Sequence, residues 1–225
     1  MDTVVVTVPD FQFDVHELAE RLRIKAADSQ MDELKELAEQ AAPLARPRAL
    51  YKLAYVDERG DDYVILDAVR FTSRVLRVNV DEADRAFVTI ASCGTELETW
   101  AEQQDDPLYG YWSEALRLQA LGAASQELLK EIDKRYRPGH MAAMNPGSLT
   151  DWPLYEQRPL FQLLGDVEAA IGVRLQPSLL MWPTKSVSSI LFPTSSDFTS
   201  CQLCPRQGCP NRRAPYEAAK MEQYL

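Results

Sequence analysis

Residues 144–191 read MNPGSLTDWPLYEQRPLFQLLGDVEAAIGVRLQPSLLMWPTKSVSSIL, and this stretch decides the fold that the chain is expected to adopt. It opens on a turn at Pro146-Gly147, because proline fixes φ and glycine tolerates positive φ. An amphipathic segment follows, and two short apolar runs lie on either side of Pro183-Thr184-Lys185-Ser186. The pattern predicts a tight loop before a helix, with bare backbone groups that a ligand can reach.

Several small and polar residues of this stretch occur in an order that helical periodicity alone would not produce. They are the proline-glycine turn, the pattern G-x-x-L-x-x-S-x-x-M-x-P at 172–183, and Ser186-Val187-Ser188. The stretch resembles the activation domain of vitamin B12-dependent methionine synthase, and the resemblance reaches back as far as Ala86. It implies a stand-alone activation-domain-like protein.

In that family, the domain binds S-adenosylmethionine and docks on a corrinoid domain while an oxidised cobalamin is reductively remethylated. The resemblance therefore implies an accessory protein that supports reductive reactivation of a corrinoid-dependent methyltransferase or methionine synthase system. The partner would be a separate corrinoid protein or corrinoid methyltransferase, which supplies the cobalamin. The alternative is a module that binds a small molecule like S-adenosylmethionine, or a metal, without a catalytic role.

The ligand loop departs from the family pattern. The family reads Arg-x-x-x-Gly-Tyr, whereas Ala143 and Ser148 stand where the arginine and the tyrosine would be. A guanidinium binds a carboxylate through two parallel donors, which alanine cannot replace. The resemblance carries over Pro146 and Gly147 as ligand-binding residues, and we expect S-adenosylmethionine binding to be weak or absent.

Composition limits the classes of function. The chain has 225 residues, 46% of them apolar, which suits one globular domain. Its 24 basic and 34 acidic residues give a net charge of −10, which argues against nucleic acid as a partner. The sequence shows no secretory signal and no apolar run long enough to span a membrane, so we expect a cytoplasmic protein with no membrane partner.

The rest of the chain predicts an α+β fold, with a twisted, mostly antiparallel sheet packed against helices. Residues 1–225 are expected to form one domain, with a helical N-terminal part at 1–45 and a Cys-rich tail at 200–225. Other predicted elements are a helix that Asp14 caps, a helix over 31–44, a hairpin over 50–69, a strand over 75–80, a buried strand over 86–91 and a long helix over 113–136. The acidic segment 96–106 is expected to be an exposed helix, and Asp151-Trp152 is expected to start the next one.

Cysteines give the clearest chemical signal. Cys201, Cys204 and Cys209 fall within nine residues, and in a reducing compartment such a set favours a metal over disulfides. A C-x-x-C turn directs two thiolates to one centre, which suits zinc or an iron–sulfur cluster, and the spacing leaves both open. Cys93 would be the fourth ligand, since it lies at the rigid end of the predicted buried strand.

Two further residues complete the predicted sites. Lys185 and Ser186 lie in the turn between the apolar runs, where a lysine can neutralise an anionic ligand. The only histidines are His16 and His140, so no Ser/His/Asp or Cys/His triad is proposed, and no catalytic residue is named.

Overall fold

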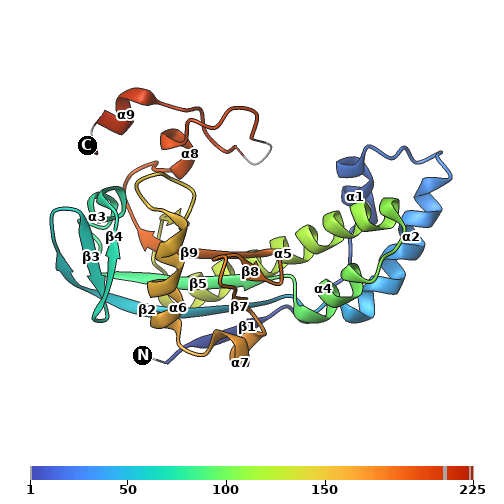
Figure 1. The fold of residues 1–225 in the computed structure, drawn as a ribbon, viewed down its shortest axis with the longest axis horizontal. Helices are drawn as coiled ribbons and strands as arrows, with labels where there is room; N and C mark the ends of the chain where they lie inside the picture. Colours follow the sequence, from blue (N-terminus) through green and yellow to red (C-terminus); the bar gives the residue numbers. More distant parts are fainter. Residues whose placement is uncertain (1, 210–211, 223, 225) are drawn as a thin grey trace.

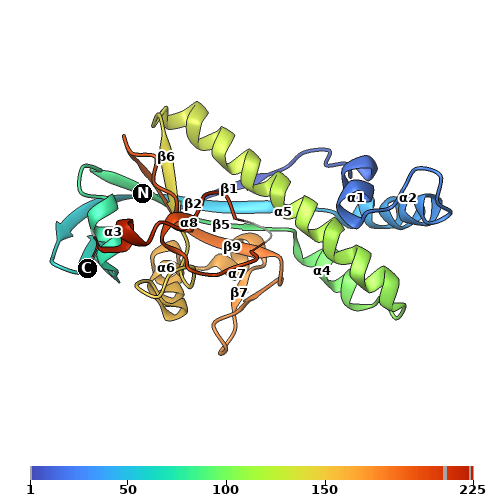
Figure 2. The same cartoon turned by 90° about the horizontal axis from the view of Figure 1, so that it is seen from above.

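The computed structural model describes residues 2–209, 212–222 and 224. Within them a sheet of seven strands, antiparallel in every pairing, runs through the middle of the molecule, and helices cover both of its faces (Figures 1 and 2). The predicted α+β class is confirmed. The strands of this sheet are β1 (Val4–Thr7), β2 (Arg48–Arg59), β3 (Tyr63–Leu66), β4 (Val69–Thr72), β5 (Arg85–Ser92), β6 (Met141–Met144) and β9 (Ser186–Pro193).

The strand order is β4-β3-β2-β5-β9-β6, with β1 paired to the first residues of β2. A separate hairpin consists of β7 (Arg174–Leu175) and β8 (Met181–Trp182). The helices are α1 (Val15–Leu22), α2 (Gln30–Ala41), α3 (Arg74–Asn79), α4 (Thr95–Glu102), α5 (Pro107–Tyr136), α6 (Gln157–Leu164), α7 (Val167–Ile171), α8 (Ser200–Leu203) and α9 (Ala218–Glu222), with 3-10 turns η1 (Ala42–Leu44) and η2 (Leu154–Glu156).

Alternation along the central strands divides the core between the two faces of the sheet. Tyr51 and Phe87 pack with Leu128 and Ile132 of α5 on one face. Their strand neighbours Leu50 and Val88 belong to the cluster on the opposite face, which includes residues of α3, α6 and α7. Figure 2 shows α5 along one side of the sheet and α6, α7 and β7 along the other. Burial of each large apolar side chain stabilises the fold by roughly 1.5–3 kcal/mol, so the layers on both faces of the sheet contribute to its stability.

β5 behaves as its composition predicts. Residues 86–91 are all buried, which confirms a strand covered on both faces. Its partner β9 belongs to the stretch quoted first, and Thr89 Oγ1 donates to the Ser189 carbonyl oxygen at 3.2 Å. The apolar run and the motif-bearing stretch therefore form the centre of one sheet.

Helix ends follow local chemistry. Asp14 Oδ1 accepts hydrogen bonds from the amides of His16 and Glu17, both at 3.0 Å, as predicted for the cap of α1. The long helix α5 begins at Pro107, six residues before the predicted start at Ser113. The reason is that Asp106 caps it through the Leu108 amide at 2.7 Å, and proline at the first helical position costs no hydrogen bond.

Two expectations about local structure are wrong. Residues 74–79 form the helix α3 and not a strand, because Ser73 Oγ accepts from the Leu76 amide at 2.9 Å and starts a helix. Asp151 does not start the following helix, since α6 begins only at Gln157. Its carboxylate instead accepts from the Val75 amide at 3.0 Å and so helps to cap α3 from a distant segment. Short apolar runs do not distinguish strand from helix, and caps from distant residues leave no local signal.

No helix within the described part of the chain is long and apolar enough to cross a membrane. Residues 2–45 contain α1 and α2 and also contribute β1 to the main sheet.

Gly94 joins β5 to α4 and provides a test of this geometry. Its φ is +98°, and a Cβ there would lie 2.5 Å from the carbonyl oxygen of Arg46. We predict that Gly94→Ala destabilises the protein by about 1–3 kcal/mol more than Gly165→Ala, because backbone atoms cannot yield to the added methyl group. Gly165 is the matched control, since its φ is +78° and a Cβ added there would have no atom within 4 Å. Chemical denaturation of both variants measures the difference, and equal stability would contradict the predicted clash.

Candidate functional site

The loop after β6 is closed by its own polar groups. Asn145 Nδ2 donates to the Ser188 carbonyl oxygen at 2.8 Å and to Ser189 Oγ at 2.6 Å, which ties the loop to β9. The Gly147 amide donates to the Trp152 carbonyl oxygen at 2.8 Å. Gly147 has φ +83°, as the predicted turn requires. The backbone of the turn is therefore partly engaged in the fold.

Ala143, at the position of the family's arginine, lies in the edge strand β6 and contacts the C-terminal tail. Ser200 Oγ donates to the Ala143 carbonyl oxygen at 3.3 Å, which places the start of α8 against this strand. Phe198 and Leu203, on either side of that contact, are buried in the same core cluster as Trp152. The cysteine-bearing tail thus lies beside the loop at 145–148.

Exposed apolar side chains occur on the same side of the sheet. Tyr155 in η2 is 56% exposed, and Leu180 between β7 and β8 is 58% exposed. Gln157 Nε2 donates to the Leu179 carbonyl oxygen at 2.9 Å and so joins the hairpin to the start of α6. We call the surface formed by residues 145–156 and 176–182 the loop face.

Lys185 and Ser186 are both paired within the protein. Lys185 Nζ lies 3.2 Å from Glu114 Oε2 on α5. Ser186 Oγ donates to the Pro183 carbonyl oxygen at 2.7 Å and lies 3.0 Å from Ser92 Oγ. These contacts hold the start of β9 against α5 and β5. The predicted role of the lysine in binding an anion stays a prediction.

A buried ion pair beside this turn was not found by sequence reasoning. Glu98 and Arg117 are 1% and 7% exposed, and Arg117 Nη1 lies 2.9 Å from Glu98 Oε2. The amide of Thr184 donates to Glu98 Oε1 at 3.1 Å, and the Thr184 hydroxyl contacts the same oxygen. The expectation that the acidic segment 96–106 is an exposed face is therefore wrong at Glu98. Its counter-ion Arg117 lies nineteen positions further along the chain, on α5. The sequence around Glu98 therefore gives no sign that this carboxylate is buried.

The Glu98 carboxyl is held in its charged form. Burial alone would raise its pKa, but hydrogen bonds from Thr184 and Arg117, together with the charge of Arg117, lower the pKa below its ordinary value. The pair joins α4 and α5 to the turn before β9. A buried pair of this kind destabilises the fold strongly when one partner is removed.

Cys93 lies within this network and not near the tail. It is fully buried, and its thiol is 3.8 Å from Glu98 Oε2. Burial, reinforced by the Glu98 charge, raises the pKa of the Cys93 thiol to about 12. Cys93 packs in the cluster of α1, α2, α4 and α5, whereas Cys204 packs against the cluster on the loop face. The structure does not bring it together with the other three cysteines.

The tail cysteines are free thiols, and each is partly exposed. Cys201 lies in α8, Cys204 follows this helix, and Cys209 comes after Gly208, which has φ +65°. Among the described residues, no three cysteine, histidine or carboxylate side chains are gathered around one point where a metal would be held. The donor chemistry suits a thiolate-bound metal, but the three thiols do not converge in this structure, so metal binding stays a prediction.

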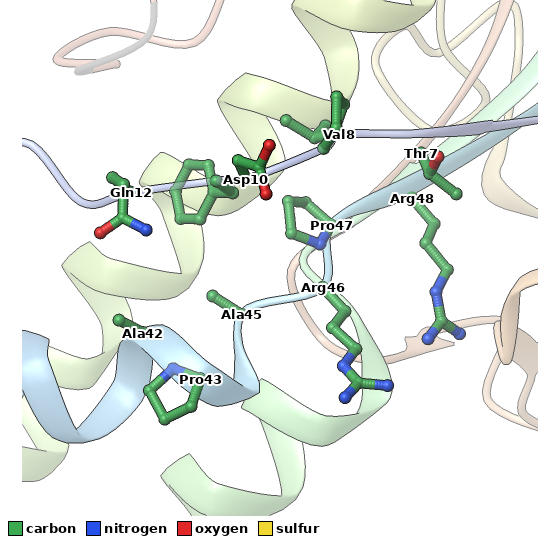
Figure 3. A pocket seen from close by; sticks show the side chains of 12 residues that line it. Thr7, Val8, Asp10, Gln12, Ala42, Pro43, Ala45, Arg46, Pro47 and Arg48 are labelled. Atoms are coloured by element: carbon green, nitrogen blue, oxygen red, sulfur yellow. The ribbon is translucent and has the colours of Figure 1, made fainter.

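A cavity of about 520 Å³ lies elsewhere, between the end of β1 and residues 42–48. Figure 3 shows the guanidinium groups of Arg46 and Arg48 directed away from Asp10. Arg48 Nη2 is bound to Glu96 Oε1 at 2.7 Å. None of the residues predicted as site residues lines this cavity, and it does not contribute to the candidate site.

No protein-family model and no curated protein matches the chain. A solved structure described as "Crystal Structure of the MetH Reactivation Domain bound to AdoHcy" is similar over 89% of this chain and 82% of its own, with a TM-score of 0.58 and 17% sequence identity. This chain has the fold of the MetH reactivation domain. The fold implied by residues 144–191 is thereby confirmed.

The buried ion pair provides a test of how the reactivation-domain fold is stabilised here. We predict that Glu98→Gln lowers the free energy of unfolding by about 3–5 kcal/mol, because the buried Arg117 loses its close counter-ion and keeps only the exposed Glu114 carboxylate at 3.8 Å. Glu102→Gln on the same helix is the control, since Glu102 is exposed and its contact to Trp182 Nε1 can be kept by an amide oxygen.

The same pair predicts a dependence on pH. The folded-state pKa of Glu98 is lower than its ordinary value of 4.5, so the stabilisation is complete above that pH and is lost as the pH falls through the folded-state pKa. Denaturation of the wild-type protein and of Glu98→Gln in acidic buffers should show their stabilities converging. Equal losses at every pH would contradict the role of the Glu98 charge.

Glu156 predicts the opposite dependence. It is buried beneath the loop face, and its Oε2 accepts from the Thr72 amide at 2.9 Å. Burial raises the pKa of its carboxyl, so ionisation destabilises the folded state as the pH rises through that pKa. We expect Glu156→Gln to gain stability relative to wild type between mildly acidic and neutral buffer. Thermal melts of both proteins measure this, and a difference that does not change with pH would refute it.

Proposed function

We propose that the chain is an accessory protein that supports reductive reactivation of a corrinoid-dependent methyltransferase or methionine synthase system by docking on a corrinoid protein. The observation that supports this most is the similarity to the MetH reactivation domain over 89% of the chain. The cobalamin would remain on the partner. A separate reductant would supply the one electron that reduces cob(II)alamin to cob(I)alamin there.

The loop face is the surface that we assign to docking. It contains part of the segment that carries the resemblance, and Tyr155 and Leu180 expose apolar area on it. Aromatic and large aliphatic side chains of this kind supply most of the binding energy of protein interfaces. The exposed Tyr111 and Leu129 belong to α5, outside the loop face, and serve as a comparison.

Binding of S-adenosylmethionine is proposed to be weak or absent. The similar structure is described as bound to AdoHcy, but here Ala143 and Ser148 replace the arginine and tyrosine of the family loop. Ser148 Oγ donates within the loop, to the Asn145 carbonyl oxygen at 2.6 Å. Pro146 and Gly147 alone offer no side chain that pairs with a carboxylate.

Titration calorimetry with S-adenosylmethionine and with S-adenosylhomocysteine measures this directly. Loss of a charge-assisted bidentate contact is worth about 1.5–3 kcal/mol, which weakens binding by roughly 10- to 150-fold. We therefore expect no micromolar binding of either compound. Micromolar binding would show that another residue has taken the place of the arginine.

The docking proposal is tested with a purified corrinoid protein in the cob(II)alamin state and a low-potential one-electron donor. We expect co-purification of the two proteins and faster loss of the cob(II)alamin signal when the chain is added. Tyr155→Ser combined with Leu180→Ser should abolish both effects, whereas Tyr111→Ser combined with Leu129→Ser should leave them unchanged. No binding and no effect on rate would overturn the proposal, and ligand binding without corrinoid-protein contact would favour the small-molecule module.

A further inference from the structure

The C-terminal loop that carries three cysteines is shaped by one arginine. Arg212 Nη1 donates to the carbonyl oxygens of Cys201 and Ala214 at 3.0 and 3.2 Å. Its Nη2 donates to the Cys204 carbonyl oxygen at 3.0 Å and also contacts the Arg206 carbonyl oxygen. A single planar guanidinium thus joins both ends of the loop, which a lysine could not do because it lacks the fixed fork of donors.

Backbone hydrogen bonds close the segment that contains the three cysteines. The Cys204 amide donates to the Cys201 carbonyl oxygen at 3.3 Å, which closes the first turn. Gly208 permits the reversal that precedes Cys209, and the Arg212 amide donates to the Cys209 carbonyl oxygen at 3.2 Å. All three cysteines are therefore held on one short closed segment.

The surroundings of Cys201 offer a hydrogen-bond donor to sulfur and nearby positive charge. The Arg213 amide donates to Cys201 Sγ at 3.4 Å, and amide donors to sulfur stabilise metal-bound thiolates. Arg206, Arg212 and Arg213 add positive charge to this segment of a chain whose net charge is −10. Such charge offsets the negative charge that several thiolates bring to one centre.

The platform beneath the loop is part of the folded core. Leu203 is buried, and the Glu217 amide donates to the Gln202 carbonyl oxygen at 2.8 Å, which binds the segment after the loop back to α8. Ser200 Oγ ties α8 to β6. A ligand at the loop would therefore be anchored to the sheet edge beside the loop face.

We propose that Cys201, Cys204 and Cys209 bind one thiolate-ligated metal centre, that Arg212 positions their loop, and that Cys93 takes no part. The three thiols come together when the metal displaces their protons, since metal binding and the ordering of ligands are coupled. Three ligands from the chain leave one position to a group outside this set, because a zinc ion takes four ligands and a [2Fe–2S] or [4Fe–4S] cluster takes four protein ligands. Zinc and an iron–sulfur cluster share this ligand chemistry.

Metal and acid-labile sulfide analysis tests the centre on the full chain, prepared without oxygen and supplied with iron and sulfide or with zinc. We expect one centre per chain in the wild-type protein and in Cys93→Ala, and none in Cys204→Ser. Sulfide with a visible absorption band identifies a cluster, and zinc without colour identifies a zinc site. A metal-free wild type under both conditions, a fully loaded Cys204→Ser, or a folded Cys93→Ala that has lost its metal would overturn the proposal.

Arg212→Lys tests the positioning role, with Arg213→Lys as the matched neighbour. Loss of a residue that orients metal ligands weakens metal binding by about 10- to 100-fold, and competition with a chelator measures the change. In metal-free protein, Arg212→Lys should also increase the alkylation rate of Cys201, because the loop opens, while Arg213→Lys behaves like wild type. Equal affinities and alkylation rates in the two variants would refute this role.

The corrinoid role and the metal centre can fail separately. Metal binding is measured on the isolated chain, whereas docking requires the corrinoid protein. A metal-binding chain that does not affect cob(II)alamin would contradict only the function proposed above, and a docking chain without metal would contradict only the centre.

Discussion

The pairing of β5 with β9 is the constraint on which the rest of the structure depends. Six consecutive residue pairs, from Phe87 with Leu191 to Ser92 with Ser186, join segments that lie about a hundred positions apart in the sequence. Closing so long a loop is entropically costly, and the apolar residues 86–91, buried on both faces, supply the compensating free energy. Every site residue outside the tail is positioned relative to these two strands.

Polar contacts then fix what the pairing brings together. At one end of β9, the Glu98–Arg117 pair and Thr184 hold the turn that contains Lys185. Within the first half of the same strand, Asn145 joins the loop after β6 to β9. Both sets of contacts are partly or fully buried, so they fix one arrangement of these segments as well as stabilising it. The turn at Pro146-Gly147 and Lys185 thus take part in the fold, and their role in ligand binding stays a prediction.

Much of the fold can be predicted from the sequence where the signal is local. The apolar run of β5, the cap at Asp14 and the amphipathic pattern of α6 each follow from short patterns. Prediction fails where distant residues decide the outcome: Asp151 contacts the first turn of α3 instead of starting the next helix, and Glu98 is buried because its counter-ion lies on α5. The candidate site shows the same division. The spacing of the tail cysteines can be read from the sequence. The hydrogen bonds from Arg212 to their loop, and the position of Cys93 in another part of the core, are known only from the structure.

Docking of the loop face on a corrinoid protein is the central claim. Hydrogen–deuterium exchange of the chain with and without a cob(II)alamin-loaded corrinoid protein tests it most directly. We predict slower exchange in residues 145–156 and 176–182 on addition of the partner, with α5 unchanged. Protection confined to α5, or no protection anywhere at partner concentrations that saturate binding, would contradict it.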